Sequence, residues 1–147
     1  MFNRIVVGTD GSDTAANAVR QATELAKLTG AQLSIVSAFA PVSGRRVAGE
    51  KLDAPADVQY EIGPREDVNL ILDAAAAAAR KEGVEVQTHP VEADPADAIL
   101  NVAEETGADL IVVGNKGMTG ARRYILGSVP NNISHHAPCS VMIIRTT

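Results

Sequence analysis

The stretch LIVVGNKGMTGARRYILGS, residues Leu110 to Ser128, combines an apolar run, a glycine-rich loop and a helix start. The apolar run predicts a strand buried on both faces. Gly114, Gly117 and Gly127 follow it, and glycine lets another molecule approach the backbone closely. A helix that begins near Ser128 would offer unpaired N–H groups and the positive end of its dipole. The order of these features predicts a phosphate site, although a glycine pattern alone is weak evidence and the alternative is a surface loop whose glycines serve turns.

Three cations in this loop, Lys116, Arg122 and Arg123, would either neutralise a phosphate or remain solvated. The loop is not a Walker A motif. That motif requires Gly-Lys followed by Ser or Thr at the helix start, whereas Gly127-Ser128 is followed by Val129-Pro130.

Outward from this stretch, apolar runs and helical periodicities alternate along the chain. The expected strands are residues 4–8, 32–38, 84–88, 110–113 and 140–145. The expected helices lie between Ser12 and Gly30, over 67–81, between Asp94 and Gly107, and over 128–136. Segment 39–65 has no period and is punctuated by glycine and proline, so we interpret it as a mobile flap near a site or as partly disordered.

Strands that alternate with helices predict an α/β fold with three layers, α/β/α, around a five-stranded parallel sheet. Right-handed crossovers favour the strand order 3-2-1-4-5, with strand one in the centre. Residues 1–147 are expected to form a single domain. Ligands of such sheets bind beyond the carboxyl ends of the strands where the strand order reverses, which is between strands one and four. Asp10 and Gly114 both follow these strands.

The composition excludes several classes of protein. A net charge of −5 argues against general nucleic-acid binding. No apolar run approaches the roughly 20 residues of a membrane span, and the N-terminus does not resemble a signal peptide. Cys139 is the one cysteine, which excludes an internal disulfide and fits a reducing cytoplasm. The protein is therefore expected to be cytoplasmic, with no membrane or nucleic-acid partner.

The loop after the first strand, GTDGSD, carries two carboxylates that would repel phosphate. Asp10 there could accept hydrogen bonds from ribose hydroxyls or help to hold a hydrated Mg²⁺, or it could serve only the Asp-Gly turn. Asp13 is predicted to cap the following helix, with Ser12 as the alternative cap. Without cysteines or carboxylates at ligand spacing, a metal site made only of protein groups is not expected.

With these residues in place, the chain resembles a universal stress protein. The family motif G-x2-G-x9-G-[S/T] is matched by Gly114, Gly117, Gly127 and Ser128. The opening IVVGTDGSDTAANAV, the segment ADLIVVGNKG and the end SVPNNISHHAPCSVMIIR are also similar to members of the family. The resemblance covers essentially the whole chain and implies an adenine nucleotide alpha-hydrolase-like, Rossmann-like fold with an adenine-nucleotide site.

In ATP-binding relatives the Asp after strand one contacts the nucleoside, the end of strand two borders adenine, and the glycine loop takes ribose and phosphates. The resemblance therefore implies a nucleotide site, and from the residues themselves neither a catalytic residue nor a resident metal is expected. The residues implied for it are Gly8, Thr9, Asp10, Gly11, Ala38, Phe39, Gly114, Asn115, Gly117, Gly127, Ser128, Val129 and Pro130. Relatives commonly dimerise through their last strands, so a homodimer is expected around Val141 to Ile144.

One residue departs from the pattern of ATP-binding relatives, which often have Ser or Thr where this chain has Pro130. Proline supplies neither a hydroxyl nor an N–H, and a triphosphate needs such donors more than a cyclic phosphate does. Cyclic AMP and ATP, the latter with Mg²⁺, are therefore both expected ligands, with a preference for cyclic AMP. The leading hypothesis is a non-enzymatic protein that senses or buffers nucleotide in a stress response. A slow Mg²⁺-dependent ATPase and a ligand-free partner-binding module are the alternatives.

Overall fold

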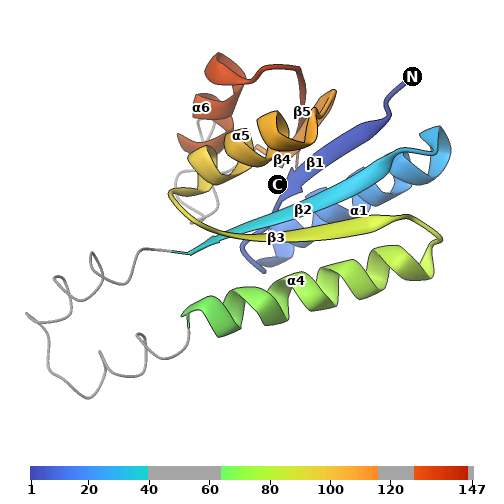
Figure 1. Cartoon of the computed structure of the whole chain (residues 1–147), viewed down its shortest axis with the longest axis horizontal. Coiled ribbons are helices and arrows are strands. Elements are labelled where there is room, and N and C mark those ends of the chain that lie inside the picture. Colours follow the sequence, from blue (N-terminus) through green and yellow to red (C-terminus); the bar gives the residue numbers. More distant parts are fainter. Residues whose placement is uncertain (40–63, 116–127, 146–147) are drawn as a thin grey trace, which may run out of the picture.

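The computed structural model describes residues 1–39, 64–115 and 128–145, and its strands form one parallel sheet of five (Figure 1). The strands are β1 (Arg4–Gly8), β2 (Gln32–Phe39), β3 (Val86–Glu92), β4 (Leu110–Gly114) and β5 (Ser140–Ile144). They lie in the order β3-β2-β1-β4-β5, with every neighbouring pair parallel. The predicted strand order is confirmed.

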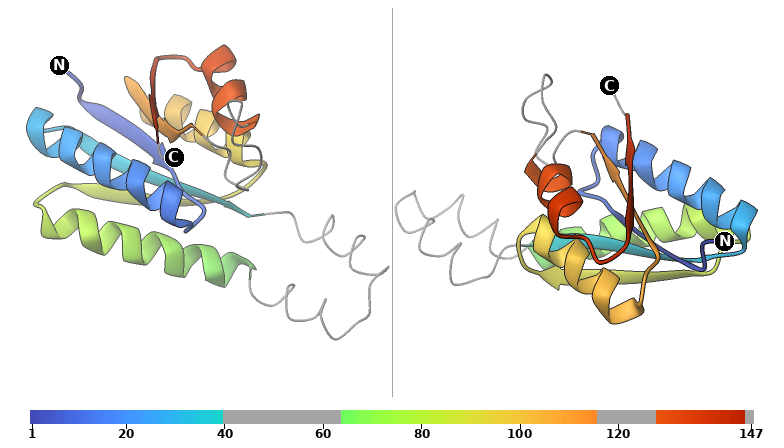
Figure 2. Two further views of the ribbon diagram at one scale, coloured as in Figure 1. Left: turned by 180° about the vertical axis from the view of Figure 1, so that it is seen from behind. Right: turned by 90° about the horizontal axis from the view of Figure 1, so that it is seen from above.

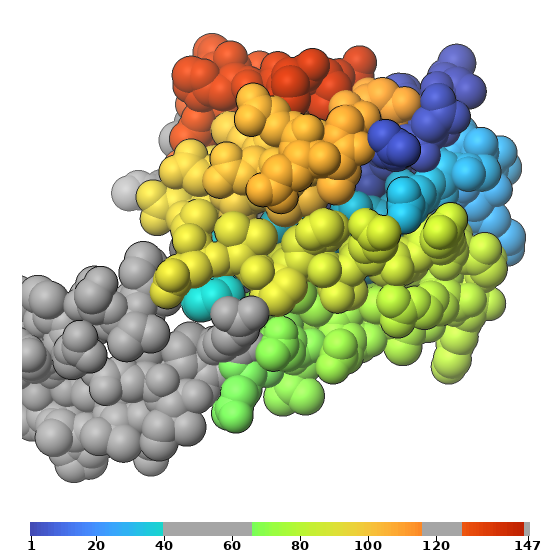
Figure 3. Space-filling view, viewed as in Figure 1, coloured from blue at the N-terminus to red at the C-terminus, as the bar shows by residue number. Residues whose placement is uncertain are grey.

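Helices cover both faces of this sheet. They are α1 (Asp13–Thr29), α4 (Pro64–Lys81), α5 (Pro95–Thr106) and α6 (Ser128–His136). Seen along the sheet, α1 and α4 lie on one face and α5 and α6 on the other (Figure 2). The space-filling view shows α6 directly beside α5, with β3 and then α4 below them (Figure 3). The predicted three-layer α/β/α architecture is confirmed.

Two separate cores explain why the central strands are apolar without alternation. Ile5, Val7 and Val112 point to the core beneath α1 and α4, whereas Val6 and Val113 point to the core beneath α5 and α6. All five of these side chains have no exposed surface. A strand buried on both faces has no polar side, and the short Val- and Ile-rich runs follow from that.

The third strand differs from the prediction, which placed it at residues 84–88. The strand instead runs from Val86 through Pro90 to Glu92. Proline is tolerated at a sheet edge because its missing N–H can face away from the neighbouring strand. Helix α4 also begins earlier than predicted, at Pro64 rather than at Asp67.

The start of α1 corrects a second prediction. Ser12, not Asp13, is the N-cap, and its Oγ accepts a hydrogen bond of 3.2 Å from the N–H of Ala15. Asp13 is the first helical residue and lies in the first turn, where a carboxylate suits the helix dipole. At α5, Asp94 is the N-cap as predicted, but its side chain makes no capping hydrogen bond. Gly30 and Gly107 end α1 and α5 in the left-handed conformation, as predicted.

Some predictions fall outside the described residues. These include the flap interpretation of residues 40–63 and the phosphate contacts assigned to Lys116, Gly117, Arg122, Arg123 and Gly127. Within the described ranges, no helix combines the length and the apolar character that crossing a membrane would require.

Asp109 ties the beginning of β1 to the turn before β4. Its carboxylate accepts hydrogen bonds from the N–H groups of Asn3 (2.9 Å) and Arg4 (3.1 Å). Burial by itself would raise the pKa of Asp109, but backbone N–H groups, those of Asn3 and Arg4 foremost, and the N-terminal charge together hold that pKa below its usual value. Cys139 packs at the edge of the core beneath α5 and α6, and burial raises the pKa of its thiol, which favours the protonated form.

His89, on the edge strand β3, predicts a pH dependence of stability. Burial lowers the pKa of its imidazole, only partly offset by the Glu105 carboxylate, and its Nε2 has no partner among the described residues. The folded pKa of His89 lies below the unfolded value of about 6.5. The contribution of neutral His89 to the free energy of unfolding is therefore fully present above about pH 6.5 and is lost as pH falls through the folded pKa. Urea unfolding between pH 5 and pH 8 should show this acid loss, and His89→Gln should flatten it in that window. An equally steep profile in the variant would contradict the assignment.

Candidate functional site

The carboxyl ends of β1 and β4 separate at the centre of the sheet, and the position between these two ends is named the crevice. The register between these strands stops at Val7 opposite Val112. Each strand continues with its other neighbour, since Gly8 pairs with Val36 and Gly114 pairs with Ile144. Beyond β1 the chain turns to α1 on one face, and the strand order reverses between β1 and β4. This is the position at which α/β sheets bind ligands.

The β1–α1 loop forms one wall of the crevice and is held by its own hydrogen bonds. Thr9 is buried, and its N–H donates to the carbonyl of Val36 at 2.9 Å. Thr9 Oγ1 accepts from the N–H of Gly11 at 3.1 Å, and Asp10 Oδ1 accepts from the N–H of Ser12 at 2.9 Å. The second carboxylate oxygen of Asp10 takes no part in this turn bond, so the turn role and a ligand role of Asp10 are compatible.

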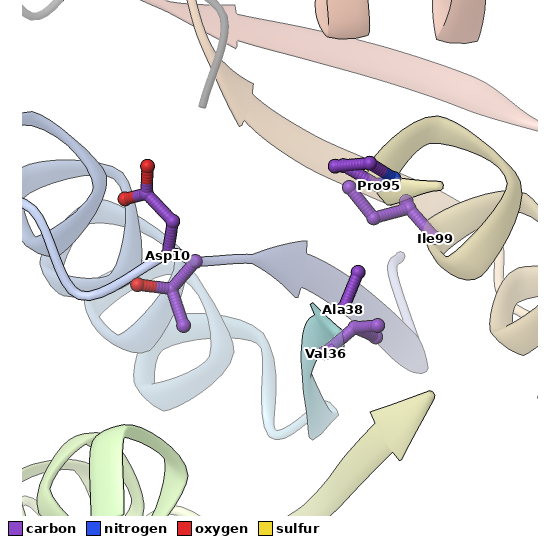
Figure 4. A pocket seen from close by; sticks show the side chains of 6 residues that line it. Asp10, Val36, Ala38, Pro95 and Ile99 are labelled. Carbon is purple, nitrogen blue, oxygen red and sulfur yellow. The ribbon is translucent and has the colours of Figure 1, made fainter. Parts of the chain in front are cut away.

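A small hollow lies next to this loop on the α5 side of the sheet. It has a volume of about 30 Å³ and is lined by Thr9, Asp10, Val36, Ala38, Pro95 and Ile99. Asp10 stands on one side of it and the start of α5 on the other, with Val36 and Ala38 as the floor (Figure 4). Such a volume holds about one water molecule, whereas drug-sized ligands need several hundred Å³. The hollow is therefore too small to hold a drug-sized ligand by itself.

The structure brings some of the predicted site residues to this edge and places others elsewhere. Thr9, Asp10 and Ala38 line the same hollow, and Gly8 and Gly114 end the two strands of the crevice. Phe39, one residue beyond Ala38, packs instead against the core beneath α1 and α4. Gly11 contacts α4 through the side chain of Ile71.

The remaining predicted residues belong to β4 and α6. Asn115 continues from β4, and its N–H donates to the carbonyl of Ile144 at 2.8 Å. Ser128 is exposed at the first position of α6, while Val129 and Pro130 are buried against the core beneath that helix. Pro130 lies in the first turn of α6 as predicted, where the missing N–H costs no helical bond.

Pro95 and Ile99 line the hollow but were not predicted as site residues. The sequence assigns Pro95 to a helix start and Ile99 to a buried helix face, and both assignments are correct. Their part in the hollow depends on which face of the sheet α5 covers. The signal available in the sequence was that α5 begins directly after a strand, at the carboxyl edge of the sheet.

The described residues hold no group of three or more His, Cys, Asp or Glu side chains arranged to bind a metal ion. His135 and His136 are exposed at the end of α6, with ring centroids 6.4 Å apart. A Mg²⁺ ion at Asp10 would therefore need phosphate oxygens and water as its other ligands.

Comparison with known proteins identifies the family. The model of the universal stress protein family matches residues 1–145. This chain belongs to that family. Universal stress protein Rv1636 of Mycobacterium tuberculosis is 37% identical over 147 residues, which cover 99% of this chain and 98% of the relative. Universal stress protein YxiE of Bacillus subtilis is 38% identical over 153 residues, covering 99% of this chain and all of the relative.

Solved structures of universal stress proteins share the fold, and some of them are complexes with an adenine nucleotide. A universal stress protein in complex with cAMP is 32% identical to this one, with a TM-score of 0.74 and 99% coverage of both chains. The universal stress protein from Archaeoglobus fulgidus in complex with dAMP is 27% identical, with a TM-score of 0.68, and covers 97% of this chain and 98% of its own. The family resemblance expected from the sequence is thus confirmed over nearly the full length of this universal stress protein.

Proposed function

We propose that this universal stress protein binds an adenine nucleotide, cyclic AMP or ATP, in the crevice between β1 and β4, and that its occupancy senses or buffers the nucleotide during stress. One observation carries the proposal: Thr9, Asp10 and Ala38, which the resemblance assigns to the nucleotide site, line one hollow at the switch point of the sheet. The complexes of relatives with cAMP and dAMP support the adenine-nucleotide class.

The proposed arrangement follows from the chemistry of the walls. Val36, Ala38 and Ile99 offer apolar surface to an adenine ring, and Asp10 offers a carboxylate oxygen to a ribose hydroxyl. The phosphate would lie toward Gly114 and the N-terminus of α6, away from the Asp10 charge, because a helix N-terminus favours an anion. Mg²⁺ would accompany ATP but not cyclic AMP.

Calorimetric titration of the full chain with cyclic AMP, ATP, AMP and GTP tests this proposal. We expect the adenine nucleotides to bind and cyclic AMP to bind more tightly than ATP, because Pro130 gives the phosphate region neither an N–H nor a hydroxyl. GTP should bind more weakly, since its exocyclic oxygen and amino group do not suit an apolar floor. Absence of binding by all four nucleotides at millimolar concentration would remove the proposal.

Slow ATP hydrolysis is the second candidate function. Hydrolysis requires a group that positions water at the γ-phosphate and groups that stabilise its charge. Asp10 is the carboxylate that lines the hollow among the described residues, so it is the candidate for this task. Phosphate release measured with and without Mg²⁺ distinguishes the two functions. We expect ligand binding without turnover.

We also propose a homodimer formed through β5, because the two edges of the sheet are unequal. At the β3 edge, Pro90 lacks an N–H and the Val86 carbonyl accepts a hydrogen bond from Arg80 at 3.1 Å. At the β5 edge, Met142 and Ile143 are 37% and 39% exposed. Exposed apolar edge strands pair readily, whereas proline and covering side chains prevent pairing. A partner-binding module without nucleotide would use this same edge. Calorimetric titration with nucleotides separates such a module from a nucleotide-binding protein.

A further inference from the structure

The loop that carries Asp10 rests against α4, a helix on the other face of the sheet from the hollow. Gly11 has φ +84°, a left-handed conformation that favours glycine. A Cβ atom on Gly11 would lie 2.9 Å from Cδ1 and 3.0 Å from Cγ1 of Ile71. The Ile71 side chain therefore lies against the backbone of the loop at Gly11, and a Cβ there would require the Ile71 side chain to shift.

Contacts within the loop connect Ile71 to the hollow. Thr9 lines the hollow on one side and, with Gly11 and Ile71, lines an apolar groove of about 560 Å³ between α1 and α4 on the other. The hydrogen bonds from Gly11 N–H to Thr9 and from Ser12 N–H to Asp10 join the loop into one unit. A displacement of Gly11 would therefore move Asp10 relative to Val36 and Ala38.

We propose that Ile71 is a positioning residue of the nucleotide site, which fixes the β1–α1 loop from behind so that Asp10 keeps its place at the hollow. This inference rests on the proposed function for its ligand. Ile71 touches no part of the hollow itself. It acts through Gly11, because binding groups must be held within about an ångström of their working position by the residues behind them.

The sequence around Ile71 supplies a matched control. Leu70 precedes it on α4, lines the same groove and is 68% exposed. Leu70→Ala removes a similar amount of apolar side chain from the groove without removing the contact with Gly11. Any effect of a looser groove or of a changed helix α4 would appear in Leu70→Ala as well as in Ile71→Ala.

The experiment measures loop order and affinity in the same variants. Hydrogen exchange of the Ser12 amide should become about tenfold faster in Ile71→Ala, because the loop opens more often. The dissociation constant for cyclic AMP should rise about fivefold, as expected for a residue that acts through another. Leu70→Ala should change neither quantity. Ile71→Val should give values between those of the unaltered chain and Ile71→Ala, and it replaces Ile71→Ala in the test if that variant does not fold. Equal exchange and equal affinity in Ile71→Ala and Leu70→Ala would overturn the inference.

A double-variant cycle tests the contact itself. Gly11→Ala should speed exchange strongly in the presence of Ile71 and less in the Ile71→Ala background, because the collision with Cδ1 is then absent and only the backbone strain remains. Additive effects would show that the two residues are independent and would overturn the inference. If the unaltered chain binds no nucleotide, the proposed function fails, while the exchange measurements still decide whether Ile71 holds the loop.

Discussion

Replacing Asp10 by alanine is expected to weaken adenine-nucleotide binding about 100-fold. A hydrogen bond to a charged group contributes about 1.5–3 kcal/mol, and each 1.4 kcal/mol corresponds to a factor of about ten in affinity. Alanine also removes the acceptor for the Ser12 N–H, which loosens the loop. Asp10→Asn keeps an oxygen for that turn bond and should lose only about tenfold. Calorimetric titration with cyclic AMP and AMP measures both changes.

The matched control for this prediction is Asp13→Asn. Asp13 is exposed in the first turn of α1, three residues from Asp10, and does not line the hollow. Both Asn variants remove one negative charge from the same region, so a general electrostatic effect would appear equally in both. We expect Asp13→Asn to leave affinity unchanged. Equal affinities in the two variants would contradict a direct contact from Asp10.

The sugar provides a second check on the same contact. If Asp10 accepts from the 2′-hydroxyl, AMP should bind more tightly than dAMP to the unaltered chain, and the two should bind alike to Asp10→Ala. The Archaeoglobus fulgidus relative in complex with dAMP indicates that a family member can bind without that hydroxyl. An unchanged difference between AMP and dAMP in Asp10→Ala would place the hydroxyl at another residue.

The fold was predictable because its strongest signals are local. Non-alternating apolar runs such as those of β1 and β4 require burial on both faces, and that burial requires helices on both faces of the sheet. Handedness and short connections then leave few strand orders. The errors in the predicted strand ends occur where a residue preference depends on the neighbouring strand. The third strand was predicted to end before Pro90, and the sequence alone could not establish that the nitrogen of Pro90 faces away from β2.

The site was only partly predictable for the same reason. Asp10 follows from the rule that ligands bind at the carboxyl ends of the central strands, whereas Ala38 was implied only by the family resemblance; both line the hollow. Phe39 differs from Ala38 by one residue, and in a strand one residue decides the face, so it packs on the other core. Ile71 is distant in sequence from Gly11, and its contact depends on the packing of α4 beside α1. No periodicity reports a contact of this kind.

The backbone directions at the two sheet edges determine how the proposed dimer can be tested. The Ile144 carbonyl accepts from the Asn115 N–H, so the polar backbone groups of Ile144 face β4. Because these directions alternate along a strand, the N–H and C=O of Ile143 and Val141 face away from β4. At the opposite edge the Glu85 carbonyl accepts from Leu33 N–H, so the same alternation turns the nitrogen of Pro90 outward. One edge is therefore open and the other is already blocked by a proline.

Ile143→Pro is expected to convert the proposed dimer to a folded monomer. The substitution removes an outward N–H without removing a bond to β4. A two-fold contact uses the same strand of both chains, so each dimer would carry two prolines and lose two N–H groups. Two lost hydrogen bonds and the carbonyls left unpaired correspond to at least about a 100-fold weaker association. Light scattering after gel filtration measures the mass, and Ile143→Thr, which keeps the N–H, is the control that should remain dimeric.

A monomeric unaltered chain at micromolar concentration, or an Ile143→Pro variant that still forms dimers, would contradict pairing through this edge. Loss of folding in Ile143→Pro would show instead that its N–H faces β4.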